Sequence, residues 1–174
     1  MKRLAVLFSM VLFIGLGFSW AQSNSGPQDV SALKDEIIRL QNSGELSIKN
    51  IKACSKINGY GSYVELDPPK VKSGDRLLVY LEPANYYINK NNSKYEIYLI
   101  EDMLVLNDKG DILWGKEGAV KYNYSSDNPV LDLFIANAID IKGLVPGRYI
   151  FKAEVSDKLK SQKASGILSF EVIE

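Results

Sequence analysis

The sequence contains no histidine and only one cysteine, Cys54, among its 174 residues. The absence of histidine excludes Ser-His and Cys-His nucleophilic pairs and most zinc sites. With one cysteine no intramolecular disulfide can form, so the hydrophobic core must supply the stability of the fold. We expect Cys54 to be a small buried residue; a reactive thiol or an intermolecular disulfide is the alternative.

An excess of charge of either sign is also lacking, because 21 basic residues balance 21 acidic ones. Nothing in this balance favours nucleic acid as a partner. The segment Asn107–Asp111 has calcium-loop residue types, but Gly118 stands at the twelfth position, where a calcium loop carries glutamate. A hairpin turn with Gly110 at positive φ is the better interpretation. We therefore expect no cofactor and no metal ion.

Only one long apolar run is present, from Leu4 to Phe18. Lys2 and Arg3 precede it and Ser19-Trp20-Ala21 follows, so residues 1–21 are expected to be a signal peptide cleaved after Ala21. An uncleaved membrane anchor is the alternative. Cleavage would remove two basic residues, leaving 19 against 21 acidic ones. The expected location is periplasmic or secreted, with no membrane span in the mature chain.

Residues 22–28 are small and polar, which is typical of a flexible leader. Residues 29–44 then show helical periodicity, with Asp29 or Ser31 able to cap the start and Gly44 following the end. The helix is too short to be stable alone, so its apolar stripe must pack on the domain or on a partner. We expect packing on the domain. The stripe consists of Val30, Leu33, Ile37 and Leu40.

Residues 45–174 alternate apolar and polar positions between strong turn signals, which predicts one mainly β domain. The expected fold is an antiparallel β-sandwich with one short N-terminal helix. A change of phase near Asn50 requires a bulge in the first strand. The expected strands further along the chain are 77–82, 95–106, 111–115, 120–124, 130–138, 148–156 and 168–173.

The segment Leu144-Val145-Pro146-Gly147-Arg148-Tyr149 resembles the tyrosine corner of immunoglobulin-like and fibronectin type III-like sandwiches. The resemblance implies structural roles for Leu144, Pro146 and Gly147, and a hydrogen bond from the Tyr149 hydroxyl to upstream backbone. Residues 54–63 and 74–83 are similar to exported bacterial proteins of unassigned function. Neither resemblance implies an activity, because a sandwich fold hosts many functions.

Tyrosines concentrate in two loop-like segments, 58–63 and 82–87, which we expect to lie close together. Tyrosine offers a large contact area with a polar tip, which suits a binding surface. We therefore predict a non-catalytic binding or assembly module with a protein or glycan partner. The alternative is that these tyrosines only cap the core. The candidate binding residues are Tyr60, Tyr63, Glu82, Asn85, Tyr86 and Tyr87.

Two other functions remain open. A carboxylate-based hydrolase of the cell envelope would use two of Glu82, Glu101 and Asp102, provided that two of them face each other across a cleft. A structural component of an envelope complex would use the N-terminal helix as its docking element. We expect no enzymatic activity, because nothing in the sequence places two carboxylates together.

Overall fold

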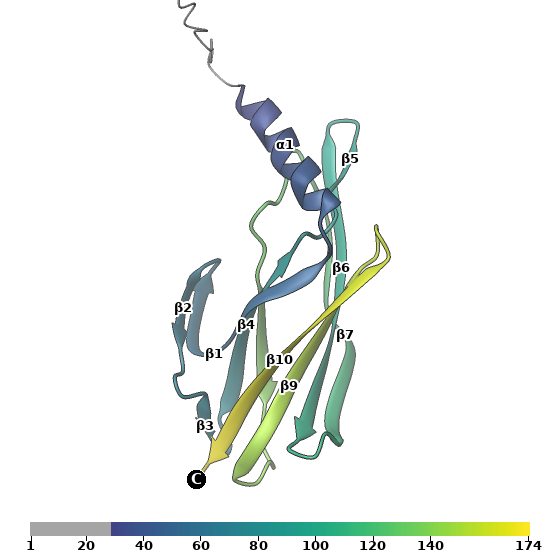
Figure 1. Cartoon of the computed structure of the whole chain (residues 1–174). Coiled ribbons are helices and arrows are strands. Elements are labelled where there is room, and N and C mark those ends of the chain that lie inside the picture. Colours follow the sequence, from purple (N-terminus) through teal and green to yellow (C-terminus); the bar gives the residue numbers. More distant parts are fainter. Residues whose placement is uncertain (1–28) are drawn as a thin grey trace, which may run out of the picture.

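The computed structural model describes residues 29–174, which form a mainly β structure with one helix (Figure 1). The expected signal peptide and leader, residues 1–28, lie outside the described residues. In the described part of the chain, no helix has the length and apolar character needed to cross a membrane.

Helix α1 runs from Val30 to Ser43 and begins and ends where its capping residues predict. Asp29 is the N-cap, and its carboxylate accepts a hydrogen bond from the Ser31 backbone N–H at 3.0 Å. Gly44 follows as the C-cap, with extended backbone. Figure 1 places α1 at one end of the sheets, beside β5 and far from the C-terminus.

Two sheets make up the rest of the described chain. The four-stranded sheet has the order β2 (Ser62–Glu65), β1 (Ser47–Gly59), β4 (Arg76–Ala84) and β8 (Ile135–Asp140). The six-stranded sheet has the order β3 (Lys70–Lys72), β10 (Gln162–Ile173), β9 (Gly147–Asp157), β6 (Lys94–Asn107) and β5 (Asn89–Asn91), with β7 (Ile112–Ser126) also paired to β6. Pairing is antiparallel, as expected, except between the short strand β3 and β10, which are parallel.

A single hydrophobic core takes side chains from both sheets. On β9, alternate residues from Tyr149 to Val155 are buried, as their two-residue period predicts. Leu77 and Val79 of β4 contribute to the same core from the other sheet. Cys54 is buried with 1% of its surface exposed, which agrees with the expected packing role and not with a reactive thiol.

Several strand limits differ from the sequence expectations; β10, for example, begins at Gln162 and not at residue 168. The two strands expected at 111–115 and 120–124 are one continuous strand, β7. Strand β8 starts at Ile135 and not at residue 130. Ser62 and Tyr63, expected to lie in a loop, begin strand β2 (Ser62–Glu65), because the turn before them folds the chain back onto β1.

The bulge expected in the first strand is present. The register of β1 against β4 shifts between Lys49 and Lys52, and Asn50 adopts φ 51°. Its side-chain amide donates to the Glu82 carboxylate at 2.6 Å. An asparagine tolerates this left-handed conformation better than most residues do.

A second, larger bulge interrupts the middle of β7. Val120 pairs with Glu101 and Lys116 pairs with Met103, so three residues of β7 face the single residue Asp102. Gly118 lies in this bulge at φ 55°, and its N–H donates to the Asp102 carboxylate at 2.6 Å.

The corner before β9 has the hydrogen bond that the sequence resemblance implies. The Tyr149 hydroxyl donates to the Val145 carbonyl oxygen at 2.7 Å, and the Tyr149 ring stacks on Phe170. Leu144 is half-buried and joins the edge of the core, whereas Pro146 is exposed. The bond satisfies the hydroxyl of a buried ring and fixes the entry to β9.

Candidate functional site

A hydrogen-bonded tyrosine joins the two tyrosine-rich segments. Tyr80 on β4 is fully buried, and its hydroxyl accepts from the Gly61 backbone N–H at 2.8 Å and donates to the Glu82 carboxylate at 2.5 Å. The Tyr63 ring lies against Tyr80 with 4.4 Å between ring centroids. Burial and the bond to Glu82 raise the pKa of Tyr80 to about 12. The β1–β2 hairpin is thereby held beside the end of β4.

Tyr86 is a core residue that also contributes to the pocket surface beside α1. Only 1% of Tyr86 is exposed, and its hydroxyl donates to the Val130 carbonyl oxygen at 2.9 Å. Burial raises the pKa of the Tyr86 hydroxyl. The Gln41 side chain of α1 donates to the Tyr86 carbonyl oxygen at 3.0 Å. Tyr86 therefore anchors the loop after β4, and this part of the core-capping interpretation holds.

A pocket of about 370 Å³ opens where α1, β4, the β1–β2 turn and the segment before β8 meet; we call it the α1 pocket. Four of the six candidate binding residues line it. Its lining residues are Ile37, Leu40, Gln41, Lys49, Tyr60, Glu82, Pro83, Ala84, Asn85, Tyr86, Leu131 and Leu133.

The two remaining candidates lie outside this lining. Tyr63 is half-buried against Tyr80. Tyr87 is half-buried too, and its backbone N–H donates to the Asp157 carboxylate at 2.6 Å. Tyr86 and Tyr87 are adjacent in the chain, whereas Tyr60 lies in the turn between β1 and β2 and Tyr63 lies on β2 after the turn.

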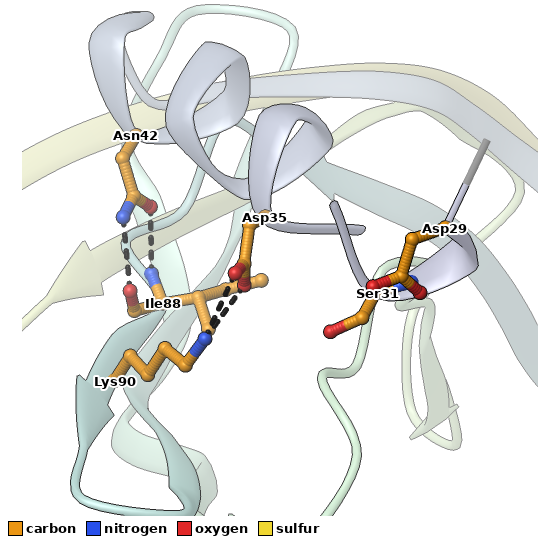
Figure 2. Close-up of polar contacts among 6 residues, drawn as sticks. All are labelled: Asp29, Ser31, Asp35, Asn42, Ile88 and Lys90. Atoms are coloured by element: carbon orange, nitrogen blue, oxygen red, sulfur yellow. Dashed lines mark hydrogen bonds and ion pairs between the residues drawn. The ribbon is translucent and has the colours of Figure 1, made fainter. Parts of the chain in front are cut away.

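Helix α1 docks through its polar edge (Figure 2). The Asn42 amide makes two bonds with the backbone of Ile88, donating to its carbonyl oxygen at 2.9 Å and accepting from its N–H at 2.8 Å. Lys90 of β5 pairs with Asp35 at 2.8 Å. Lys160, in the β9–β10 turn, donates to the carbonyl oxygens of Asn42 and Gly44 at 2.7 and 3.0 Å. A cation at this end of a helix is favourable.

The apolar stripe of α1 is left in solvent, which overturns the expectation that it packs on the domain. Ile38, next to the stripe, is the buried residue of this helix. Sequence periodicity identified the stripe but not its exposure, because the helix contacts the domain through the Asn42 hydrogen bonds and the buried Ile38. The exposed fractions are 65% for Val30, 43% for Leu33, 46% for Ile37 and 55% for Leu40.

Polar groups surround the apolar part of the α1 pocket. Tyr60 is 47% exposed, and partial burial together with the charges of Glu82 and Asp132 raises the pKa of its hydroxyl. Glu82 is already bonded to Asn50 and Tyr80, which fixes its position at the rim. Lys49 adds a positive charge to the same lining. The pocket thus combines aliphatic walls, one aromatic ring and both signs of charge.

A hollow of similar volume, about 380 Å³, lies over the stacked rings of Tyr149 and Phe170. Its rim includes Lys70 and Glu171, which pair with each other at 2.8 Å. None of the candidate binding residues lines it. Because its floor and rim serve the corner and the β3–β10 pairing, the α1 pocket is the stronger site.

The three carboxylates considered for hydrolysis do not face one another across a cleft. Glu101 is buried between the sheets with 1% exposed, and the Asn137 amide donates to it at 2.9 Å. Asp102, the next residue of the strand, lies on the opposite face and binds Gly118. Within residues 29–174, no group of three or more Cys, Asp or Glu side chains is placed to hold a metal ion.

No family model matches this sequence, and no curated protein matches it. A family 123 glycoside hydrolase from Clostridium perfringens, solved to describe glycolipid glycan hydrolysis, is similar over 74% of this chain and 27% of its own, at 14% identity and TM-score 0.42. The Pseudomonas fluorescens alkylpurine DNA glycosylase AlkC, bound to DNA with an abasic-site analogue, is similar over 83% of this chain and 36% of its own, at 13% identity and TM-score 0.38. Likenesses this low carry no functional argument.

Proposed function

We propose that this chain is a non-catalytic binding or assembly module and that its partner binds at the α1 pocket. One observation carries the proposal: the exposed Ile37 and Leu40 of the helix meet the exposed Tyr60 at a pocket with polar groups at its rim. An exposed apolar patch rimmed by polar residues is typical of an interaction site. Aromatic side chains are also enriched where partners bind.

The lining favours a protein over a glycan as the partner. Leu131 and Leu133 line the pocket together with Ile37 and Leu40, and such aliphatic walls suit apolar side chains of a protein segment. A glycan would use the Tyr60 ring for stacking and Glu82 for hydrogen bonds. It would leave the aliphatic walls without a contact, so it is the alternative and not the main proposal.

A hydrolase is not the function that the pocket supports. Hydrolysis of a glycosidic bond uses two carboxyl groups on either side of the scissile bond. Glu82 is the one carboxylate in the lining of the α1 pocket, and it is held by Asn50 and Tyr80.

We further propose that the protein acts after export, as a periplasmic or secreted protein, with residues 1–21 removed as a signal peptide. The basic pair, the apolar run and the Ser19-Trp20-Ala21 site support this proposal. Intact-mass measurement of the protein recovered from outside the cytoplasm should match a chain that begins at Gln22. Retention of Met1 to Ala21 would contradict it.

Substitution of Tyr60 tests the binding site. Tyr60→Ala should weaken capture of the native partner from cell envelopes by about tenfold or more, as expected for an aromatic anchor. Tyr124→Ala is the matched control, because Tyr124 is 49% exposed on β7, away from the pocket. Equal capture by both variants, with unchanged folding by circular dichroism, would reject the site. A glycan array measured with the same pair identifies a glycan partner.

A further inference from the structure

The stripe of α1 has the spacing of a coiled-coil seam. With Val30 and Ile37 at the a positions of a heptad, Leu33 and Leu40 fall at the d positions. All four side chains are between 43% and 65% exposed, and Ile37 and Leu40, in the second half of the helix, also line the α1 pocket. β-Branched residues at a with leucine at d are the pattern that favours two parallel strands.

We propose that the partner at this helix is a second copy of the chain, joined by parallel pairing of the two α1 helices. This inference rests on the proposed assembly function and specifies its partner. It needs the stripe and the charges beside it, and it does not depend on a contact at Tyr60.

The charges beside the seam are complementary in the parallel arrangement. Asp29, the N-cap, directly precedes the first a position, and Lys34 is at the following e position, so in a parallel pair Lys34 of one copy lies beside the N-cap carboxylate of the other. Lys34 takes part in none of the ion pairs found within residues 29–174. An antiparallel pair would instead bring Lys34 against Lys34 and Glu36 against Glu36, which is unfavourable.

Contacts with the β domain stabilise α1, which would otherwise be too short to pair stably with a second helix. A 14-residue helix is marginal on its own, because forming its first turn is costly. Here Asn42 and Asp35 already fix α1 on the sheets through bonds made on the side away from the seam (Figure 2). The second helix therefore meets a preformed surface, and less ordering entropy is lost on association.

Cysteine cross-linking tests the orientation. In a parallel pair each residue at an a or d position faces the same residue of the other copy. Ile37→Cys and Leu40→Cys should each form a covalent dimer on oxidation, whereas Arg39→Cys, on an exposed side of the helix, should not. The native Cys54 does not interfere, because it is buried. Cross-linking only in a mixture of Leu33→Cys with Ile37→Cys would show antiparallel pairing and overturn the proposal.

Sedimentation of the purified protein over a range of concentrations tests the association itself. Leu33→Lys should weaken self-association by about tenfold or more, since it buries a charge in the seam. Ile167→Lys is the matched control, because Ile167 is 64% exposed on β10. Identical association by both variants, or a monomer at every concentration of the unsubstituted protein, would overturn the dimer.

The two proposals fail separately. If the protein is monomeric but Tyr60→Ala still abolishes partner capture, the second copy is rejected and the binding module stands. If Leu33→Lys abolishes the dimer while Tyr60→Ala leaves capture unchanged, the dimer stands and the site at Tyr60 is rejected.

Discussion

Strand β9 and helix α1 are both amphipathic in sequence, but they use their apolar faces in opposite ways. On β9, Phe151 and Val155 have no exposed surface, and the polar residues between them are partly in solvent. On α1, Ile37 and Leu40 are about half exposed, and Asn42 makes the contacts with the domain. Apolar periodicity therefore predicts the type of an element, whereas the face that docks depends on the polar partners within reach.

The largest expected difference between the two elements is in stability. Phe151→Ala should lower the free energy of unfolding by about 3 to 5 kcal/mol, because it opens a cavity in the core. Leu33→Ala should lower it by less than about 1 kcal/mol, since that side chain is already 43% exposed. Denaturant unfolding measures both. A comparable loss from the two substitutions would show that the helix stripe is packed against the domain after all.

Glu101 is the opposite case to the exposed apolar stripe of α1, because it is a polar side chain buried inside the apolar core. Burial, opposed by the Asn137 hydrogen bond and assisted by the charge of Asp102, raises its pKa from 4.5 to about 7. The folded state then holds the proton more tightly than the unfolded chain, so stability falls as pH rises from about 4.5 and levels off above about 7.

Glu101→Gln should remove this dependence and stabilise the protein at pH 8 by on the order of 2 to 3 kcal/mol. Oε2 of Glu101 has no partner in the described structure, so the amide of glutamine breaks no bond at that atom. Unfolding at pH 5 and pH 8 measures the change. Glu117→Gln, at an exposed carboxylate of β7, is the control, and an unchanged slope of stability against pH in Glu101→Gln would contradict the expected effect.

The polar docking of α1 predicts a smaller and local effect. Asn42→Ala should cost about 1 to 3 kcal/mol, because it leaves the N–H and carbonyl of Ile88 without their partner. Hydrogen exchange at the Ile88 amide should speed up, while exchange within β9 stays unchanged. Ser43→Ala, which removes one exposed bond to Leu40, serves as the control. Equal protection of Ile88 in both variants would contradict polar docking.

The smallest expected effect comes from the exposed ion pair between Asp35 and Lys90. Solvent and salt screen such a pair, so Asp35→Ala should leave the unfolding midpoint nearly unchanged at physiological ionic strength. The difference from the unsubstituted protein should grow only at low salt. A large loss of stability at high salt would show that Asp35 does more than pair with Lys90.

Much of the architecture follows from the sequence alone. Alternation predicts the long strands of the core, and the phase change at Asn50 predicts the bulge in β1. Asp29 and Gly44 predict the helix ends, and the turn at Gly110 has its expected positive φ of 88°. Each of these depends on a local preference of the backbone. The immunoglobulin-like family assignment stays a prediction.

Features that depend on distant partners could not be read from the sequence. The parallel pairing of β3 joins segments about a hundred residues apart. Lys160, in the turn between β9 and β10, binds the carbonyl end of α1, a contact that its place in a polar turn does not predict. The aliphatic side of the α1 pocket was missed for the same reason, because Leu131 and Leu133 meet the helix only in three dimensions.

The bulge in β7 has a consequence for how copies of this protein meet. In the described part of the chain β7 pairs with β6 alone, so its other edge offers free backbone groups along a strand of 15 residues. The three-residue bulge at Gly118 divides that edge into two shorter stretches, because a bulge leaves its extra residues unpaired and increases the local twist. An incoming strand finds no continuous template, so the interruption protects the protein from open-ended, amyloid-like stacking.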